Sequence, residues 1–156
     1  MVEENILEKY KLELGLINFM VSKFSGRITR TRLLKLFYLI DFHAKEKLGK
    51  KITQFSYDYY FYGPYSETFI KLLDFSNGFE VLETSRINKN SEIIHLYSKG
   101  TAPRVDKIGG LLSSKEKTII SEVIKDYASL NFQALLKAVY ATKPMQDKSF
   151  GAKNIL

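Results

Sequence analysis

The side chains that most often carry out catalysis are sparse in this sequence and stand in no recognised pattern. The chain has no cysteine and two histidines, His43 and His95, and neither belongs to a metal-binding pattern such as His-Glu-x-x-His. Ser66 does not stand in the Gly-x-Ser-x-Gly elbow of hydrolases. Gly109-Gly110 is not followed by the lysine that a phosphate loop needs. The sequence therefore predicts a protein that is not an enzyme and that has no cofactor and no metal site.

The densest unusual feature is a group of five tyrosines between residues 57 and 65. Tyr57 and Tyr59 alternate with polar residues, which favours burial on one face of a strand. The other three tyrosines fall on the opposite face or at a glycine–proline corner, where an exposed aromatic ring can anchor a protein partner. Stacking on single-stranded nucleic acid is a less favoured alternative, because no basic residue interleaves this strand. The predicted partner-binding residues are Tyr60, Tyr62, Gly63, Pro64 and Tyr65.

Basic residues cluster in the stretch from residue 23 to residue 51. Nine basic and two acidic residues lie there, so this stretch accounts for the whole net charge of +7. Such a cluster indicates an anionic partner, either nucleic acid or an acidic protein surface. A solvated rim of lysines that binds nothing is an equally weighted alternative. The predicted rim consists of Arg27, Arg30, Arg32, Lys35, Lys47, Lys50 and Lys51.

The elements that position these residues follow from hydrophobic periodicity. Apolar residues at spacings of three and four predict a central helix over Thr29–Leu48, ended by Gly49. Alternation over Phe55–Phe61 predicts a half-buried strand with one aromatic face. The glycine–proline corner that follows is expected to turn straight into a helix over Pro64–Phe75.

The remaining segments predict three more helices and a hairpin. Helical spacing predicts a first helix over Asn5–Phe24. Phe79–Thr84 and Glu92–Tyr97 flank a polar, asparagine-rich turn and are expected to form a β-hairpin. A capping-box pattern at Ser113 predicts the start of the next helix, and Asn131 is expected to cap the last one.

The expected fold is an α+β single domain of about five helices with a small antiparallel sheet, formed by the aromatic strand and the hairpin. The domain is expected to span residues 1–143, and residues 144–156 carry no strong signal and are expected to form a loose tail. The acidic N-terminus and the interrupted apolar stretches predict no signal peptide and no membrane span. The absence of cysteine favours a cytoplasmic location. The oligomeric state stays open.

The order of several short motifs resembles a known family. The motifs are Lys35-Leu36-Phe37-Tyr38, Asp41-Phe42, Gly49, Ile52-Thr53 and Tyr62-Gly63-Pro64. They stand where the Panacea domain family, the SocA-like antitoxin domain, has a leucine-rich helix, a Gly-x-x-Ile-Thr connector and a Tyr-Gly-Pro corner. The resemblance covers roughly residues 12 to 75, and the later elements are compatible to about residue 140. The chain departs from the family in Tyr65-Ser66, where a small aliphatic residue is common, and in lacking a C-terminal tryptophan.

The resemblance implies a non-enzymatic, phage-associated protein-binding module of a type II toxin–antitoxin system. Such a module binds a cognate toxin, neutralises it or delivers it to a protease. A winged-helix-like, nucleic-acid-binding regulatory domain is the alternative, in which Arg27, Arg30, Arg32 and Lys35 contact phosphates. The central helix is very apolar for a helix that lies in a DNA groove. A purely structural homo-oligomer is the third hypothesis.

Overall fold

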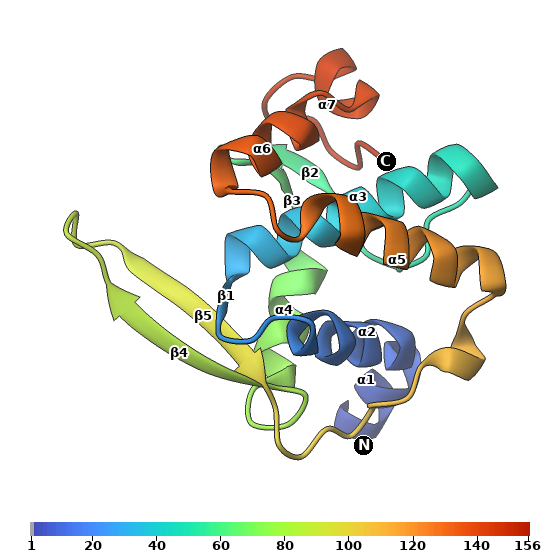
Figure 1. Cartoon of the computed structure of the whole chain (residues 1–156), viewed down its shortest axis with the longest axis vertical. Coiled ribbons are helices and arrows are strands. Elements are labelled where there is room, and N and C mark those ends of the chain that lie inside the picture. The colour runs from blue at the N-terminus through green and yellow to red at the C-terminus, as the bar shows by residue number, and fades with distance from the viewer. Residues whose placement is uncertain (1) are drawn as a thin grey trace. The chain divides into compact units, whose positions relative to one another are not determined.

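The computed structural model describes residues 2–156, with side chains described from residue 3 onward. The chain divides into two compact units, one formed by Met1–Leu33 and Ile70–Leu111 and the other by Leu34–Phe69 and Leu112–Leu156. Helices α3 (Arg30–Leu48) and α4 (Glu67–Ser76) contribute residues to both units (Figure 1). The described residues form seven α-helices and two small antiparallel sheets, so the α+β class is confirmed.

The first unit contains two N-terminal helices where the periodicity predicts one. Helix α1 (Val2–Lys9) and helix α2 (Lys11–Ser22) are separated by Tyr10, whose backbone leaves the helical region at φ −115° and ψ 30°. Helix α2 is buried along most of its length and requires a glycine at one point, because a Cβ at Gly15 would overlap the Cγ2 atom of Ile108. The loop that carries Ile108 therefore packs directly against the α2 backbone.

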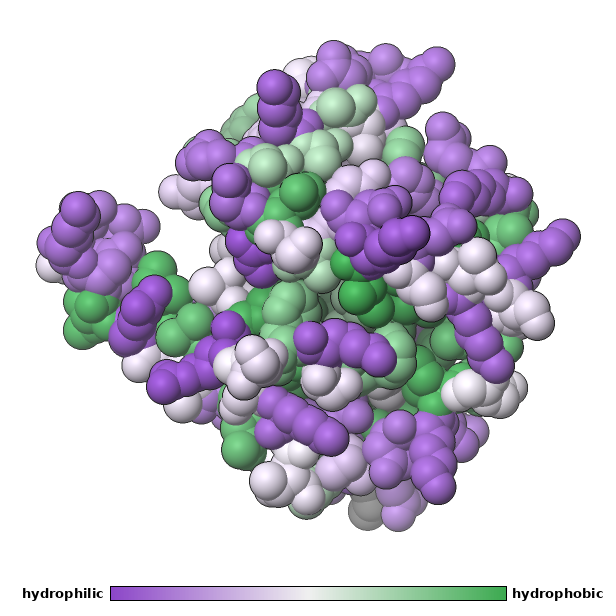
Figure 2. Space-filling model, viewed as in Figure 1, coloured by the Kyte–Doolittle hydropathy of each residue, from purple (hydrophilic) through white to green (hydrophobic). Residues whose placement is uncertain are grey.

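The sheet of the first unit has the strand order β1-β5-β4. Strands β4 (Val81–Ile87) and β5 (Ile93–Lys99) form the predicted hairpin in one unbroken antiparallel register, and β1 (Ile28–Thr29) pairs with the base of β5. The prediction that the aromatic strand joins this hairpin is wrong, because the backbone of that strand is paired within the other unit. The outer half of the hairpin extends away from helices α1 and α2 (Figure 1) and carries apolar surface (Figure 2).

The second unit contains a smaller sheet built from the tyrosine-rich stretch. Strand β2 (Asp58–Tyr60) covers only part of the predicted strand, because the chain reverses and returns as β3 (Gly63–Tyr65). Gly63 has φ +92°, a conformation that favours glycine and allows this reversal. The predicted direct entry from the corner into a helix is therefore wrong: β3 intervenes, and α4 begins at Glu67.

Three helices complete the second unit: α5 (Ser114–Tyr127), α6 (Phe132–Tyr140) and α7 (Lys143–Asp147). The capping box predicted at Ser113 is present, since its side chain accepts from the Glu116 N–H and the Glu116 carboxylate accepts from the Ser113 N–H. The Asn131 side chain likewise caps α6 by accepting from the Ala134 N–H. Both helix starts are confirmed because capping depends on residues only three positions apart.

The C-terminal segment, for which the sequence carries no strong signal, is hydrogen-bonded along β2. The Tyr59 N–H donates to the Ala152 carbonyl, the Gly151 N–H donates to the Tyr59 carbonyl, and the Ile155 N–H donates to the Tyr57 carbonyl. The Ile155 side chain is buried. Among the described residues, no helix has the length and apolar character required to cross a bilayer.

Candidate partner-binding surface

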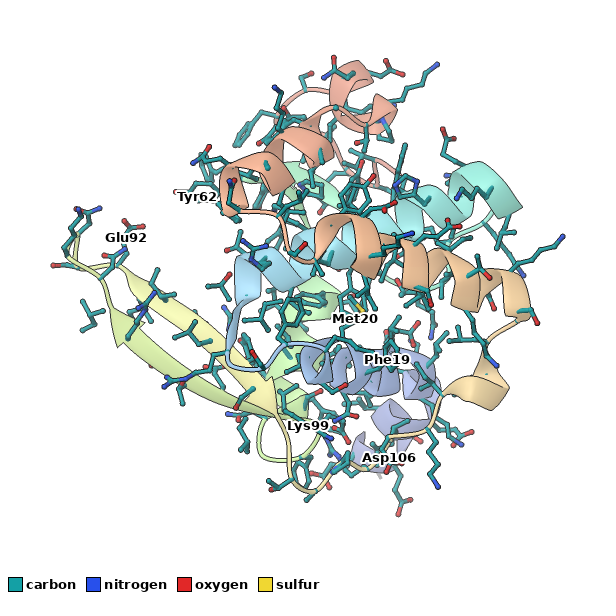
Figure 3. The ribbon with its side chains drawn as sticks, viewed as in Figure 1. Phe19, Met20, Tyr62, Glu92, Lys99 and Asp106 are labelled. Carbon is teal, nitrogen blue, oxygen red and sulfur yellow. The ribbon has the colours of Figure 1, made fainter. Side chains whose placement is uncertain are left out.

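Four aromatic side chains of the second unit are exposed next to one another at the β2–β3 turn. Phe61 is 78% exposed, Tyr62 65%, Phe150 58% and Tyr60 40%. The Phe61 and Phe150 ring centroids are 4.9 Å apart, and the Tyr60 ring lies 6.2 Å from Phe61 and 6.3 Å from Phe150. Tyr62 follows Phe61 in the turn and projects from the surface (Figure 3). We call Tyr60, Phe61, Tyr62 and Phe150 the aromatic corner.

The other predicted partner-binding residues support the corner from below. Gly63 and Pro64 are buried, and a Cβ at Gly63 would sit 3.6 Å from the Tyr140 ring. Tyr65 is half-buried and stacks on Tyr60 at a centroid distance of 5.1 Å. Gly63 and Pro64 therefore do not form contact surface themselves, because they fix the turn whose outer residues are exposed.

Asp41 anchors the strand that leads to the corner. Its carboxylate is fully buried and accepts from the Ile52 N–H and the Thr53 N–H, each at 2.9 Å. It also accepts from the Thr53 hydroxyl at 2.5 Å and the Tyr57 hydroxyl at 2.7 Å. Burial raises the pKa of Asp41, and the four hydrogen bonds oppose that rise. The segment after α3 is thereby tied to the helix before β2 begins.

Aromatic packing completes the support. The Phe37, Phe55 and Phe69 rings are mutually packed, with centroid distances of 5.3–5.6 Å. Tyr57 is fully buried, as its alternation predicts, and meets the Tyr38 ring edge-on at 5.4 Å. The segment that leads into β2 is therefore anchored in a closely packed core.

Lys35 does not lie on a basic rim, and this part of the prediction requires correction. Its side chain is 2% exposed, and its Nζ atom donates to the Pro64 carbonyl at 3.0 Å. Burial lowers the pKa of Lys35 to about 7. Lys35 occupies a position that faces the core of the second unit, and a charge count along the sequence does not distinguish such a position from a surface one.

The remaining rim residues are divided between the two units, and most have partners within their own unit. Arg30 donates to the Tyr97 hydroxyl at 3.0 Å and lies 3.8 Å from the carboxylates of Asp74 and Glu83. Lys47 pairs with Glu122 at 2.8 Å. The other members are Arg27, which donates to the Thr84 hydroxyl, half-buried Arg32, exposed Lys50, and Lys51, which donates to the Phe55 carbonyl.

The described residues contain no group of three His, Asp or Glu side chains that could hold a metal ion. His43 stacks on Tyr127 at a centroid distance of 5.8 Å, and its Nε2 atom lies 3.1 Å from the Tyr127 hydroxyl. The His95 Nδ1 atom lies 3.2 Å from Glu83. Each histidine thus belongs to a local packing contact in its own unit.

Comparison with known protein families decides the classification. The family described as antitoxin SocA-like, Panacea domain, matches residues 33–144, which is more than half of the chain. The chain belongs to this family. The resemblance inferred from the short motifs is thereby confirmed, and membership implies a role in a toxin–antitoxin system. No curated protein and no solved structure matches the chain.

The matched region of this Panacea domain includes most, but not all, of the surfaces described above. It contains Tyr60, Phe61 and Tyr62 of the aromatic corner, and it ends before Phe150. It begins after Arg27, Arg30 and Arg32. The C-terminal part of the corner therefore lies in sequence outside the family match.

Sequence reasoning missed two members of the aromatic corner. Phe61 continues the alternation of Phe55 and Tyr57, which predicts a place on the aromatic face of the strand, whereas in the structure it begins a two-residue turn. Phe150 stands in a segment without periodicity. The available signal was Gly63, because a glycine two residues after Phe61 is typical of a tight hairpin turn.

Proposed function

We propose that this Panacea domain is a non-enzymatic antitoxin that binds its cognate toxin through the aromatic corner. The observation that carries this proposal is the exposure of four aromatic side chains at one turn, three of which have rings in mutual contact. Aromatic residues are enriched among those that contribute most to protein–protein affinity. A large ring also loses little conformational entropy when it is already held by neighbouring rings.

The composition of the corner favours a protein partner over a small molecule. Phe61 and Phe150 provide apolar surface, and Tyr60 and Tyr62 add hydroxyl groups that can hydrogen-bond at the edge of an interface. Lys153 places its Nζ atom 5.7 Å from the Tyr60 ring centroid and is 72% exposed. An apolar centre with polar groups at its rim is the usual composition of a specific interface.

Delivery of the bound toxin to a protease is a further step that we propose on the basis of family membership alone. This adaptor role predicts that the toxin is degraded faster when the antitoxin is present than when it is absent. A cytoplasmic location is proposed with it. An unchanged toxin half-life in cells that contain the antitoxin would limit the function to neutralisation by binding.

A winged-helix-like nucleic-acid-binding domain is the second candidate. The strand order β1-β5-β4, with a hairpin that follows α4, favours it. The exposed positions of α4 are less suitable for contact with the negatively charged DNA backbone, because they include two acidic residues, Glu67 and Asp74, and one lysine, Lys71. This candidate predicts binding to duplex DNA whose affinity falls steeply as the salt concentration rises.

The deciding experiment is rescue of growth. The product of the gene adjacent to this one is expressed alone and together with the chain, and toxicity and co-purification are measured. We expect the neighbour to be toxic alone, to be harmless with the wild-type chain, and to co-purify with it. A neighbour that is harmless alone and does not bind contradicts the antitoxin function.

A further inference from the structure

The outer half of the β4–β5 hairpin has an open edge. The Gly78 N–H donates to the Val81 carbonyl, and the Glu83 N–H donates to the Asn77 side chain, so the backbone groups of Val81 and Glu83 point away from β5. The register of β4 and β5 contains no bulge. Because backbone groups alternate along a strand, those of Ser85 and Ile87 also point outward, and no partner for them exists among the described residues.

An apolar pair lies beside this edge. Ile87 is 72% exposed and Ile93 is 62% exposed, and the two residues are directly opposite each other in the register. They occupy the same face of the hairpin as Val81 and Tyr97, both of which are fully buried nearer its base. Glu83, Ser85 and His95 lie between the two pairs on this face, so the two isoleucines form a separate apolar patch in the outer half of the hairpin (Figure 2). Figure 3 places Glu92 at the tip of this hairpin.

The opposite face of the hairpin carries two exposed guanidinium groups beside the apolar residues Leu82, Ile94 and Leu96. Thr84 and Arg86 lie on it, and the Arg27 guanidinium donates to the Thr84 hydroxyl at 3.2 Å. Arg27 and Arg86 are both exposed, and neither forms an ion pair among the described residues. An extended segment that pairs with this edge would therefore meet two isoleucines on one face and two guanidinium groups on the other.

A second copy of this chain does not fit the edge. In antiparallel pairing of β4 with another β4, the residues whose backbone groups point outward must lie opposite each other, because those groups form the hydrogen bonds between the two strands. The register that pairs Ser85 with Ile87 of the copy sets Arg86 directly against the Arg86 of the copy, and like charges in that position are destabilising. Shifting the register toward the base requires the Glu83 backbone, whose N–H is already bonded to Asn77. Shifting it toward the tip, so that Ile87 meets Ile87 of the copy, sets Ser85 against residue 89, which lies beyond the end of β4.

We propose that the β4 edge receives an extended segment of the toxin, with an acidic residue opposite Arg86 and an apolar residue against Ile87. The toxin strand adds to the sheet through the outward N–H and carbonyl groups of Ser85 and Ile87. Closing the open edge also protects the hairpin from adventitious pairing with other strands. This inference rests on the proposed antitoxin function, but it is carried by residues that do not belong to the aromatic corner.

The test uses Ser85→Pro, because proline removes the outward N–H while the internal β4–β5 hydrogen bonds remain possible. Binding of the purified neighbouring-gene product to the full chain is measured by calorimetry. We expect Ser85→Pro to weaken binding by about tenfold and Ser85→Ala to change it by less than about twofold. Arg86→Glu is expected to weaken binding to a similar degree, with Lys107→Glu as the matched exposed control.

Hydrogen exchange gives a readout that does not depend on substitution. The amides of Ser85 and Ile87 should exchange rapidly in the free chain and slowly in the complex, and a complex in which they stay unprotected overturns the inference. If Ser85→Pro loses the hairpin fold, Ile87→Asp replaces it, since this side chain is exposed. If these variants bind the neighbouring-gene product normally and variants of the aromatic corner lose that binding, the edge inference is overturned and the antitoxin function remains supported.

Two further outcomes separate the alternatives. If the wild-type chain does not bind the neighbouring product, the antitoxin function and the edge inference are both overturned. If the chain binds duplex DNA, loses that binding in Arg86→Glu and keeps it in Ser85→Pro, the hairpin is a nucleic-acid contact rather than a site of strand addition.

Discussion

The Lys35 Nζ atom donates to the Pro64 carbonyl at 3.0 Å, and both residues are buried in the second unit. This contact joins α3 to the strand that follows the aromatic corner. An ammonium group that is removed from water loses its hydration, and one carbonyl replaces only part of it. The lysine therefore contributes to the position of the turn at a cost in stability that depends on pH.

Replacing Lys35 with methionine should remove this pH dependence. Burial lowers the pKa of Lys35 from 10.5 to about 7 in the folded chain. Between these values the unfolded chain binds more protons at this site than the folded chain, so the free energy of unfolding rises with pH. From pH 7 to pH 9 we expect the wild type to gain up to about 2 to 3 kcal/mol relative to Lys35→Met, as measured by denaturant unfolding. The exposed Lys50→Met variant is the control, and parallel curves for all three proteins would contradict the expectation.

Replacing Asp41 with asparagine should destabilise the second unit by about 2 to 4 kcal/mol, because an amide NH₂ group would face donors that now point at a carboxylate oxygen. Thermal unfolding measures the loss, and the Tyr57 hydroxyl and the Thr53 N–H should exchange faster. Asp147→Asn, at an exposed position, is the matched control and should change stability by less than about 0.5 kcal/mol. Equal effects of the two substitutions would mean that the buried network contributes nothing to stability.

Arg104 should be essential to the first unit. Its guanidinium lies between the Phe75 and Phe79 rings, at 4.3 Å and 4.0 Å from their centroids, and its Nη2 atom is 2.9 Å from the fully buried Glu80 carboxylate. Arg104→Met leaves that buried carboxylate without its counter-ion, with only the Arg104 and Val105 backbone N–H groups donating to it, and should cost about 3 to 5 kcal/mol.

A double variant makes the Arg104 prediction specific. Combining Arg104→Met with Glu80→Gln should recover part of the loss, because the uncompensated charge is removed. Arg104→Lys should not restore full stability, since lysine lacks the planar fork that meets both carboxylate oxygens. Chemical denaturation of the wild type, Arg104→Met, Glu80→Gln and the double variant measures the coupling. Strictly additive losses would show that the two side chains act independently.

Removing the exposed rings of the aromatic corner should weaken partner binding without unfolding the chain. The double variant Phe61→Ala with Tyr62→Ala deletes side chains that are 78% and 65% exposed, so the melting temperature should shift by no more than a few degrees. Binding of the neighbouring-gene product should weaken by about 2 kcal/mol or more. Leu111→Ala, which removes an apolar side chain that is 44% exposed in the first unit, is the control and should bind normally.

The sequence by itself determined the features that depend on short stretches of chain. The helix starts at Ser113 and Asn131 were predictable because a cap and its backbone partner are only three residues apart. The central helix and the burial of Tyr57 followed from periodicity, because the spacing of apolar residues shows which of them lie on the same side of a helix or strand. The order of short motifs also sufficed to indicate the family, since each motif is local and only their spacing was needed.

Only the tertiary structure decided how the strands outside the β4–β5 hairpin pair and which charges are buried. The aromatic strand pairs with β3 and the C-terminal segment instead of the hairpin. Sequence does not predict this choice, because backbone hydrogen bonds are nearly the same for all residue types and distant segments compete for the same strand edge. Lys35 is buried while Lys50 is exposed, although both belong to one basic stretch. Phe61 and Phe150 are in contact although they lie 89 positions apart in the sequence. That contact exists because the chain reverses at Gly63 and its C-terminal segment returns along β2.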